Sequence, residues 1–536
     1  MQCCEKTLYH NGRIVTLDAG DRTAEAVLAA GGRIEAVGGA AELRRLGGPR
    51  LKETDLDGLV VYPGFIDTHS HPDMLAAWAP YAYCGGTADL ASALDVLQRH
   101  GREQDQPVPM GYGFDDTAVA EQRGPNLAEM DALFPDRPAL LLHISIHAAY
   151  VNSRMYGLLG IPPDRPSDNP DAVCENGRPN GLITETLALE ALGKLPPVTT
   201  TALKQGLLRA VESYNAQGFT ACIGGGAGLG GLTPWMVYEA LAGLEIEGRL
   251  HLHVHMPVFA DWFERVLETG LLAGTGSPLL RFHGIKLLVD GSIQAYTAAV
   301  PEGYHSRPET RPAPIIPQEE LENAVFKAHS AGQQAVIHGN GNGAVEAAVR
   351  AVEKAQARCP RRDPRHLLIH CQMASDEQLA RMKAVGLWPS FFGLHVWNWG
   401  DRHHDIFLGP ERAARIDPCG GATRLGLPFS LHADTPVLPQ MTMQSIHTAV
   451  NRRTRAGRLL GPDQRVRVLD ALRAYTTHAA AMCFEEDRRG SIEPGKLADF
   501  TFLDADPRAV APEDINKVNI VSVISMGRPV WGALKD

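Results

Sequence analysis

Between residues 63 and 485, short runs of continuously apolar residues alternate with amphipathic segments. The amphipathic segments, such as PWMVYEALAGLEIEG and SDEQLARMKAVG, have the spacing of helices. Alternating helices and near-continuously apolar strands predict a parallel sheet, so the fold class is α/β. The number of units favours a (β/α)8 barrel of the TIM type over an open sheet. The runs predicted to be strands lie at 218–226, 250–258, 282–291, 333–341, 366–373 and 427–437.

Both ends of the chain have a turn-rich pattern instead. Near the start, the Asn11-Gly12 pair in TLYHNGRIVTL predicts a β-hairpin, and AEAVLAAGGRIEAVGG repeats this pattern around Gly31-Gly32. The same alternation of turn and strand residues occurs near the other end, in GSIEPGKLADFTFLDAD and NIVSVISMGRPVWG. A small β-meander needs a partner sheet. We therefore expect 1–62 and 486–536 to form one composite β-sandwich; two unrelated β-extensions are the alternative.

The segment from about 76 to 200 does not fit the alternation. It is too long for one connection between a strand and a helix, is rich in Pro, Asp and Gly, and contains its own strand candidate at 138–153. We expect it to be an insertion over the barrel mouth, within a barrel domain that spans 63–485.

Composition narrows the range of partners. The formal net charge of −11 and the lack of a Lys/Arg-rich run argue against nucleic-acid binding. No stretch reaches about 18 continuous apolar residues, and the first residues include no apolar signal segment, so we expect no membrane partner. A small-molecule substrate is the expected partner, and whether the chain forms a homo-oligomer is left open.

The nine cysteines, which include Cys3 and Cys4, are scattered and form no Cys-x-x-Cys pair. This spacing suggests neither a disulfide framework nor a zinc site made of thiolates. A reducing, cytoplasmic location is the default expectation.

The segment VYPGFIDTHSHPDM, 61–74, carries the first chemical signal. Side chains two apart on a strand point to the same face, so His69 and His71 should project together from the end of a strand at 65–68. Two imidazoles in this arrangement can bind a metal ion. The alternative is a pair of partly exposed loop histidines.

Several later predicted strands end in further ligand types. Active residues of a (β/α)8 barrel lie at the carboxyl ends of its strands. Any one of these residues has an ordinary structural explanation, but together with the His-x-His pair they predict a divalent metal site. They are Lys286 in GIKLLVDG, His338 ending AVIH, His370 ending LLIH, and Asp434 after FSLH.

These residues resemble the amidohydrolase superfamily, and most closely its third amidohydrolase family, which includes N-substituted formamide deformylase-like metal-dependent hydrolases. The likeness covers nearly the whole chain, and the resemblance implies a (β/α)8 barrel with an attached β-sandwich. The motifs that carry it are PGFIDTHSH, KLLVDGS, IHGNGNGAVE, LLIHCQMA, HADTPV and GSIEPGKLADFTFLD.

The resemblance also implies a hydrolytic centre with two divalent ions, usually zinc. One ion would be held by His69, His71 and Asp434. The second would be held by His338 and His370, with N-carboxylated Lys286 bridging the two.

The implied role of Lys286 agrees with the ligand chemistry of its modified form. A lysine ammonium cannot ligate a cation, whereas a carbamate on Lys286 is an anionic oxygen ligand. The resemblance implies attack of a metal-bound hydroxide on a non-peptide C–N bond, with Asp434 taking the proton and passing it to the leaving nitrogen.

Two motifs depart from the family pattern. His338 is followed by Gly-Asn-Gly-Asn in place of Ile-Gly-Asp, so Asn342 stands where the family has an Asp. Asp434 lies in Ala-Asp-Thr-Pro in place of Ser-Asp-Trp-Pro. Neither change removes a predicted ligand, but both alter the pocket and therefore the substrate.

Further substrate-binding candidates are His147 and Asn152 in HISIHAAYVNS, Asp115 in GYGFDD, Glu185 in GLITE, and His395 in GLHVWNWGDRHHD. Each also has a structural explanation, namely stabilising the insertion, capping or packing. The neighbouring pair His403-His404 is predicted to lie on the surface.

Three functions remain open. The first is a metal-dependent amidohydrolase that cleaves an amide, N-formyl or N-acyl bond of a small molecule. The second is a mononuclear deaminase or cyclic-amide hydrolase in which Lys286 is not carboxylated. The third is a non-catalytic metal-binding scaffold, which would require a missing ligand.

Overall fold

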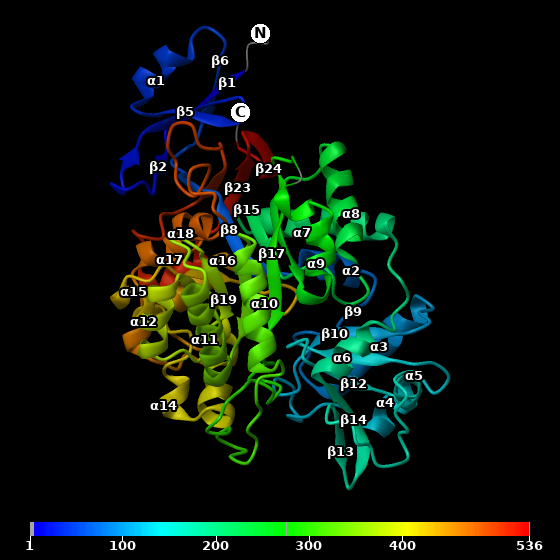
Figure 1. Cartoon of the computed structure of the whole chain (residues 1–536). Helices are drawn as coiled ribbons and strands as arrows, with labels where there is room; N and C mark the ends of the chain where they lie inside the picture. The colour runs from blue at the N-terminus through cyan, green and yellow to red at the C-terminus, as the bar shows by residue number, and fades with distance from the viewer. Residues whose placement is uncertain (1–4, 275, 535–536) are drawn as a thin grey trace.

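Eight parallel strands form the central sheet of the chain, as the alternation of apolar and amphipathic segments predicts. The structure is a computed structural model that describes residues 5–274 and 276–534 (Figure 1). The strands of this sheet follow one another in chain order. The strands are β8 (Phe65–Ser70), β15 (Phe219–Gly224), β16 (His253–Phe259), β17 (Leu280–Leu288), β18 (Ala335–Gly339), β19 (His366–His370), β20 (Leu387–Phe392) and β21 (Ser430–His432).

The sheet nearly closes into a barrel where β21 meets β8. Just beyond the strands, the backbone N–H of His71 donates to the carbonyl of Thr435 at 2.7 Å, and the N–H of Asp434 donates to the carbonyl of His69 at 3.1 Å. These two hydrogen bonds join the segments that carry three of the predicted ligands. The closure of the barrel therefore places His69 and His71 beside Asp434.

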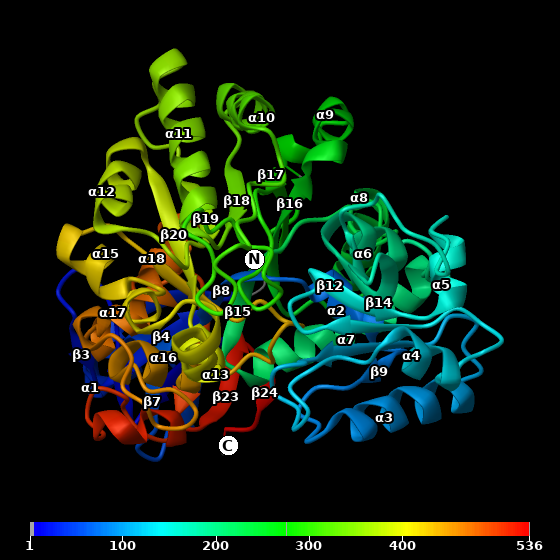
Figure 2. The ribbon, with the colours of Figure 1, turned by 90° about the horizontal axis from the view of Figure 1, so that it is seen from below.

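Helices that follow the strands in the chain surround the barrel (Figure 2). Local sequence explains their ends: α12, for example, begins with a capping box between Ser375 and Gln378 and ends at Gly386 in the left-handed region. The helices are α7 (Thr200–Ala216), α8 (Pro234–Ile246), α9 (Ala260–Glu268), α10 (Gln318–Ser330), α11 (Asn342–Arg358), α12 (Asp376–Val385), α15 (Cys419–Leu425), α16 (Thr442–Asn451), α17 (Val468–Ala474) and α18 (Thr477–Met482).

Strands from both ends of the chain share one sheet. It runs β24 (Arg528–Gly532), β23 (Ile520–Ser525), β22 (Phe500–Leu503), β7 (Val60–Pro63), β2 (Arg13–Val15) and β3 (Thr23–Ala24). A second sheet runs β5 (Arg33–Gly38), β4 (Ala26–Ala30), β1 (Lys6–His10) and β6 (Leu51–Asp55), and α1 (Ala40–Gly47) contacts it. Residues of both sheets, such as Tyr9 and Phe500, pack in one hydrophobic cluster. The assignment of these strands to a separate β-sandwich domain stays a prediction.

One of the two predicted hairpins is wrong. The hairpin around Gly31-Gly32 is present as the antiparallel pair β4 and β5. At Asn11-Gly12, by contrast, the chain passes from one sheet to the other, because β1 pairs with β4 and β6 while β2 pairs with β3 and β7. Gly12 lies so close to Leu59 that an added Cβ would be 2.6 Å from its carbonyl oxygen, so long-range packing and not the turn pair decides the path.

The predicted insertion contains a sheet of its own, and Figure 1 shows it on the side of the barrel away from β1 and β24. The strand candidate at 138–153 is an antiparallel pair, β11 and β12, joined by a short turn. In sheet order the strands are β13 (Ala172–Glu175), β14 (Arg178–Thr184), β12 (Ala148–Val151), β11 (Leu140–His143), β10 (Met110–Phe114) and β9 (Ala82–Tyr83). The accompanying helices are α2 (Pro72–Trp78), α3 (Leu90–Glu103), α4 (Leu127–Leu133), α5 (Ser153–Leu158) and α6 (Glu185–Leu192).

The described cysteines, Cys84 to Cys483, are all free thiols, while Cys3 and Cys4 lie outside the described residues. Of the helices in the described part of the chain, none combines the length and the apolar character needed to cross a bilayer.

Two buried histidines near the amino ends of the barrel strands make stability depend on pH. Burial lowers the pKa of His283 on β17 and of His366 on β19 to about 3. In the unfolded chain both imidazoles bind protons below about pH 6.5, whereas in the folded protein they stay neutral down to about pH 3. We therefore expect the free energy of unfolding to fall by on the order of 2 kcal/mol per histidine between about pH 6.5 and pH 5.

Urea unfolding at about pH 7 and about pH 5 measures this loss. The variant His283→Gln carries no group that titrates there, so the free energy of unfolding should fall less steeply with pH in the variant than in the wild type. Equal pH dependence in the two proteins would show that His283 does not contribute.

Candidate metal centre

All six predicted ligands line one pocket at the carboxyl ends of the barrel strands. The pocket has an empty volume of about 480 Å³, which includes space open to solvent. The ligands are His69 at the end of β8, His71 after it, Lys286 on β17, His338 on β18, His370 at the end of β19, and Asp434 after β21.

Two predicted ligands, His69 and His71, converge on one carboxylate oxygen of a third, Asp434. The Nε2 atoms of His69 and His71 each lie 3.4 Å from Oδ1 of Asp434. The Nζ of Lys286 lies 3.3 Å from Nε2 of His69. The sequence places both histidines at the end of a strand, but only His69 belongs to β8, since His71 occupies the N-cap position of α2.

The other two predicted histidine ligands, His338 and His370, are oriented by hydrogen bonds of their ring nitrogens. The Nε2–H of His338 donates to the carbonyl of Gly291 at 3.2 Å, so Nδ1 is the ring nitrogen without a proton. This Nδ1 lies 3.1 Å from Nε2 of His370. Nδ1 of His370 lies 3.2 Å from Nε2 of His432, whose Nδ1 lies 2.8 Å from Ser390. Such outer partners fix the tautomer and the ring orientation of a metal-binding histidine.

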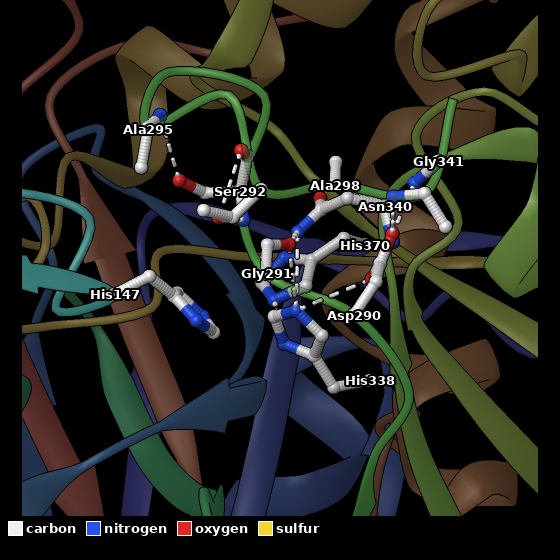
Figure 3. A network of polar contacts seen from close by, with 12 residues as sticks. His147, Asp290, Gly291, Ser292, Ala295, Ala298, His338, Asn340, Gly341 and His370 are labelled. Carbon is white, nitrogen blue, oxygen red and sulfur yellow. Dashed lines mark hydrogen bonds and ion pairs between the residues drawn. The ribbon is translucent and has the colours of Figure 1, made fainter. Parts of the chain in front are cut away.

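A buried carboxylate organises the loops behind His338 (Figure 3). Asp290 is fully buried and accepts hydrogen bonds from the backbone N–H groups of Ala299, Asn340 and Gly341 at 2.8–2.9 Å. Asn340 also donates to the carbonyl of Gly291, the same oxygen that receives the His338 proton. The sequence did not point to Asp290 or His432, although Asp290 closely follows β17 and His432 ends β21 just before Asp434.

Glycine at the end of β15 lets the ligand side chains approach. An added Cβ on Gly225 would lie 2.0 Å from Cε1 of His71. Gly226 adopts φ +121°, and a Cβ there would lie 2.9 Å from Cβ of Lys286. His370 and Asp434 themselves adopt positive φ, +66° and +53°, a costly conformation for such residues that is typical of functional sites.

The electrostatics of the centre favour neutral imidazoles. Burial, followed by repulsion from neighbouring cationic groups, holds the pKa values of His69, His338 and His370 well below their ordinary range. Burial likewise lowers the pKa of Lys286 to about 7. Burial would raise the pKa of Asp434, but His71 and other neighbours outweigh it and lower the pKa to about 2.

These donors fit a divalent cation. Oδ1 of Asp434 is buried and receives no hydrogen bond, although two imidazole nitrogens face it. Donor atoms of His69, His370 and Asp434 all lie within 4.8 Å of one another. An ionised carboxylate among neutral imidazoles is a ligand set that zinc prefers. A cation here would satisfy lone pairs that otherwise face each other.

The insertion contributes a hydrogen-bonded pair, His147 and Glu185, near the pocket. His147 lines the pocket from the turn between β11 and β12, and its ring centre lies 5.1 Å from that of His338. Glu185, at the start of α6, binds Nδ1 of His147 at 2.9 Å. Glu185 therefore orients His147 and is not itself among the residues that line the pocket.

The other substrate-binding candidates lie elsewhere. Asn152 is fully buried, caps α5 and bonds to the backbone of Ala139, so it stabilises the insertion. His395 lies behind His370, where it contacts Asp417 at 3.1 Å, and does not line the pocket. The predicted surface position of His403 is wrong, because this residue is fully buried.

Asp115 joins the insertion to the barrel and does not face the substrate pocket. It accepts hydrogen bonds from Arg402 at 2.8 Å and from Trp399 at 3.0 Å. Donor atoms of Asp115, Asp116 and His143 also lie within 4.8 Å of one another, but Arg402 already supplies a cation there.

The walls of the pocket are apolar, a feature that the sequence did not reveal. Polar side chains are confined to the predicted ligands and to Ser145 and His147. The apolar residues are Met74, Ile146, Leu189, Leu229, Phe259, Leu288 and Val437.

Known proteins are similar to this chain over nearly its whole length. A family model described as "Amidohydrolase family" matches residues 52–531. The chain is 29% identical to the putative amidohydrolase YtcJ of Bacillus subtilis (strain 168), over 98% of this chain and 99% of that protein. It is 28% identical to the N-substituted formamide deformylase of Arthrobacter pascens, over 95% of each.

A solved structure has the same fold. An uncharacterised metal-dependent hydrolase from Pyrococcus horikoshii OT3 superposes with a TM-score of 0.75 at 24% identity, over 95% of this chain and 99% of that one.

Proposed function

The chain belongs to the amidohydrolase family, and from that premise we propose that it is a metal-dependent hydrolase of a non-peptide C–N bond. The substrate is a small molecule with an amide, N-formyl or N-acyl group. The observation that carries the proposal is the convergence of six buried ligand-type side chains on one pocket. The relative named as an N-substituted formamide deformylase supports the choice of bond.

We assign the ligands to two divalent ions, which we expect to be zinc. His69, His71 and Asp434 would hold one ion, and His338 and His370 the other. N-carboxylated Lys286 would bridge them, since a carbamate supplies oxygen ligands that an ammonium lacks. When bound, such ions lower the pKa of a water and polarise a carbonyl.

The side chains of the protein supply the proton transfer and the orientation. The pKa of Asp434 lies far below neutrality, so its carboxylate is ionised and can accept a proton and return it to the leaving nitrogen. His147, held by Glu185, lines the pocket from the insertion and can hydrogen-bond to the substrate. The apolar walls exclude water around the scissile bond.

One observation favours a second candidate. Only three donors, from His69, His370 and Asp434, lie mutually within 4.8 Å in the described part of the site, which is compatible with a single ion. A mononuclear deaminase or cyclic-amide hydrolase with a free Lys286 is therefore the alternative.

Elemental analysis together with a substrate panel tests the proposal. We expect two metal ions per chain, hydrolysis of N-formyl and N-acyl amines, and loss of that activity on treatment with a chelator, with recovery on adding zinc. One ion per chain and release of ammonia from cyclic or amino-bearing substrates would favour the alternative. No bound metal and no hydrolysis would overturn both.

A further inference from the structure

A second pocket, lined mostly by apolar side chains, is formed where the insertion meets the barrel, by segments that continue from the lining of the metal pocket. It has an empty volume of about 510 Å³. Its lining carries no charged side chain, and the polar side-chain groups there are the phenol of Tyr81 and the indole N–H of Trp78. The residues of this outer pocket are Ala77, Trp78, Tyr81, Gly193, Leu195, Pro196, Pro197, Val198, Gly230, Gly231 and Leu232.

Two helices line both pockets in the same order. On α2, Met74 faces the metal pocket, and Trp78, four residues later, faces the outer pocket. Leu189 on α6 and Gly193, which caps the carboxyl end of this helix, repeat the spacing. Four residues span about one helical turn, roughly 6 Å along each axis.

Both helices lead away from the site. The first begins directly after His71, and the second begins at Glu185, the partner of His147. The outer pocket therefore lies about one turn farther from the metal centre than the walls of the inner pocket.

A glycine-rich loop separates the two pockets. Leu229 faces the metal pocket, and the next three residues line the outer one. The loop is held before Leu229 by the hydrogen bond from the indole of Trp262 to the carbonyl of Gly228 at 3.1 Å. An added Cβ on Gly230 or Gly231 would meet no atom within 4 Å, and both have positive φ, +62° and +83°. Space is therefore open beside Gly230 and Gly231, while the carbonyl of Leu229 accepts a hydrogen bond from the N–H of Leu232 at 3.1 Å.

We propose that the outer pocket is a binding subsite for an uncharged apolar tail of the substrate, and that Leu229 forms the partition past which this tail extends. The inference rests on the proposed function, because the scissile amide would lie at the metal centre. The chemical class that fits is an amide or N-acyl compound with an alkyl chain or a second ring. A tail that ends in a carboxylate or phosphate would meet no cationic partner among the lining residues.

Binding of a homologous series tests the subsite independently of turnover. Unbranched primary amides from acetamide to decanamide are titrated into the metal-loaded protein and followed by calorimetry. Each methylene buried beyond Leu229 should tighten binding about fourfold, until the outer pocket is full. The kcat/KM of N-acyl amines with the same chains should rise in parallel.

Two variants fill the outer pocket from loop positions. Val198→Trp and Leu195→Trp each place an indole where the tail would lie, and having both protects the test against misfolding of one. Each should lower the ratio of octanamide to acetamide affinity at least tenfold. The matched control is Ile246→Trp, on α8, whose side chain is 87% exposed and should keep the wild-type ratio.

The outcomes separate the subsite from the reaction. A chain-length effect that disappears in both pocket variants and persists in Ile246→Trp supports the subsite, even if no amide is hydrolysed and the proposed function fails. A flat series in the wild type, or an effect unchanged by both pocket variants, overturns the subsite while hydrolysis of short amides still upholds the function.

Discussion

Replacing Lys286 with alanine is expected to lower the metal content from two ions per chain to one or none, and kcat/KM by about 10³-fold or more. Lys286 is 1% exposed, and its amine lies 3.3 Å from Nε2 of His69 in the middle of the ligand set. Loss of the bridging group would leave each ion with fewer anionic ligands. Elemental analysis and steady-state kinetics on the same preparations measure both effects.

Two comparisons separate a ligand role from a structural one. Lys327→Ala removes an exposed lysine that pairs with Glu264, and should keep wild-type metal content and activity. A short carboxylic acid added to Lys286→Ala can enter the vacated space and should restore part of both. Unchanged metal content in Lys286→Ala would overturn the bridged centre, and native mass spectrometry that shows an unmodified lysine would exclude the carbamate.

Replacing Asp434 with asparagine is expected to lower kcat/KM by roughly 10²- to 10⁴-fold, the usual contribution of a general base. The amide keeps the shape of the side chain and one oxygen, but it cannot accept a proton. The loss should extend over the whole neutral range, because the low pKa of Asp434 keeps the wild-type carboxylate ionised there. A pH profile of kcat/KM for both proteins measures the effect.

Metal content decides how this result is read. If Asp434→Asn retains at least one ion and loses activity, the carboxylate acts in proton transfer as well as in binding. The matched control, Asp405→Asn, removes an exposed carboxylate that pairs with Arg458 and should behave as the wild type. Activity within tenfold of wild type in Asp434→Asn would contradict the assigned role.

The positions of the strand-end ligands followed from local sequence. Parallel strands buried on both faces read as continuous apolar runs, and all of them present their carboxyl ends to the same side. A histidine or aspartate at the end of such a run, like His370 or Asp434, therefore has its location set by the run itself. The structure brings these residues into one pocket.

Local signals failed where distant contacts compete with them. The Asn11-Gly12 pair has turn chemistry, yet the strands that flank it enter different sheets because each finds better partners far along the chain. His403 stands in a polar stretch, yet it is buried against Gln372. Asp115 looked like a mouth carboxylate and instead binds Arg402, nearly 300 residues later.

The sequence by itself thus determined the α/β class, the parallel strands and the types of ligand at their ends, since these depend on periodicity and on residues a few positions apart. Only the tertiary structure decided which nitrogen of His338 faces the centre, how Asp290 orders the loops behind it, and how Glu185 directs His147. It also decided the apolar walls and the outer pocket beyond Leu229. These features arise from contacts between residues that are far apart in the chain, and periodicity along one strand or helix carries no record of them.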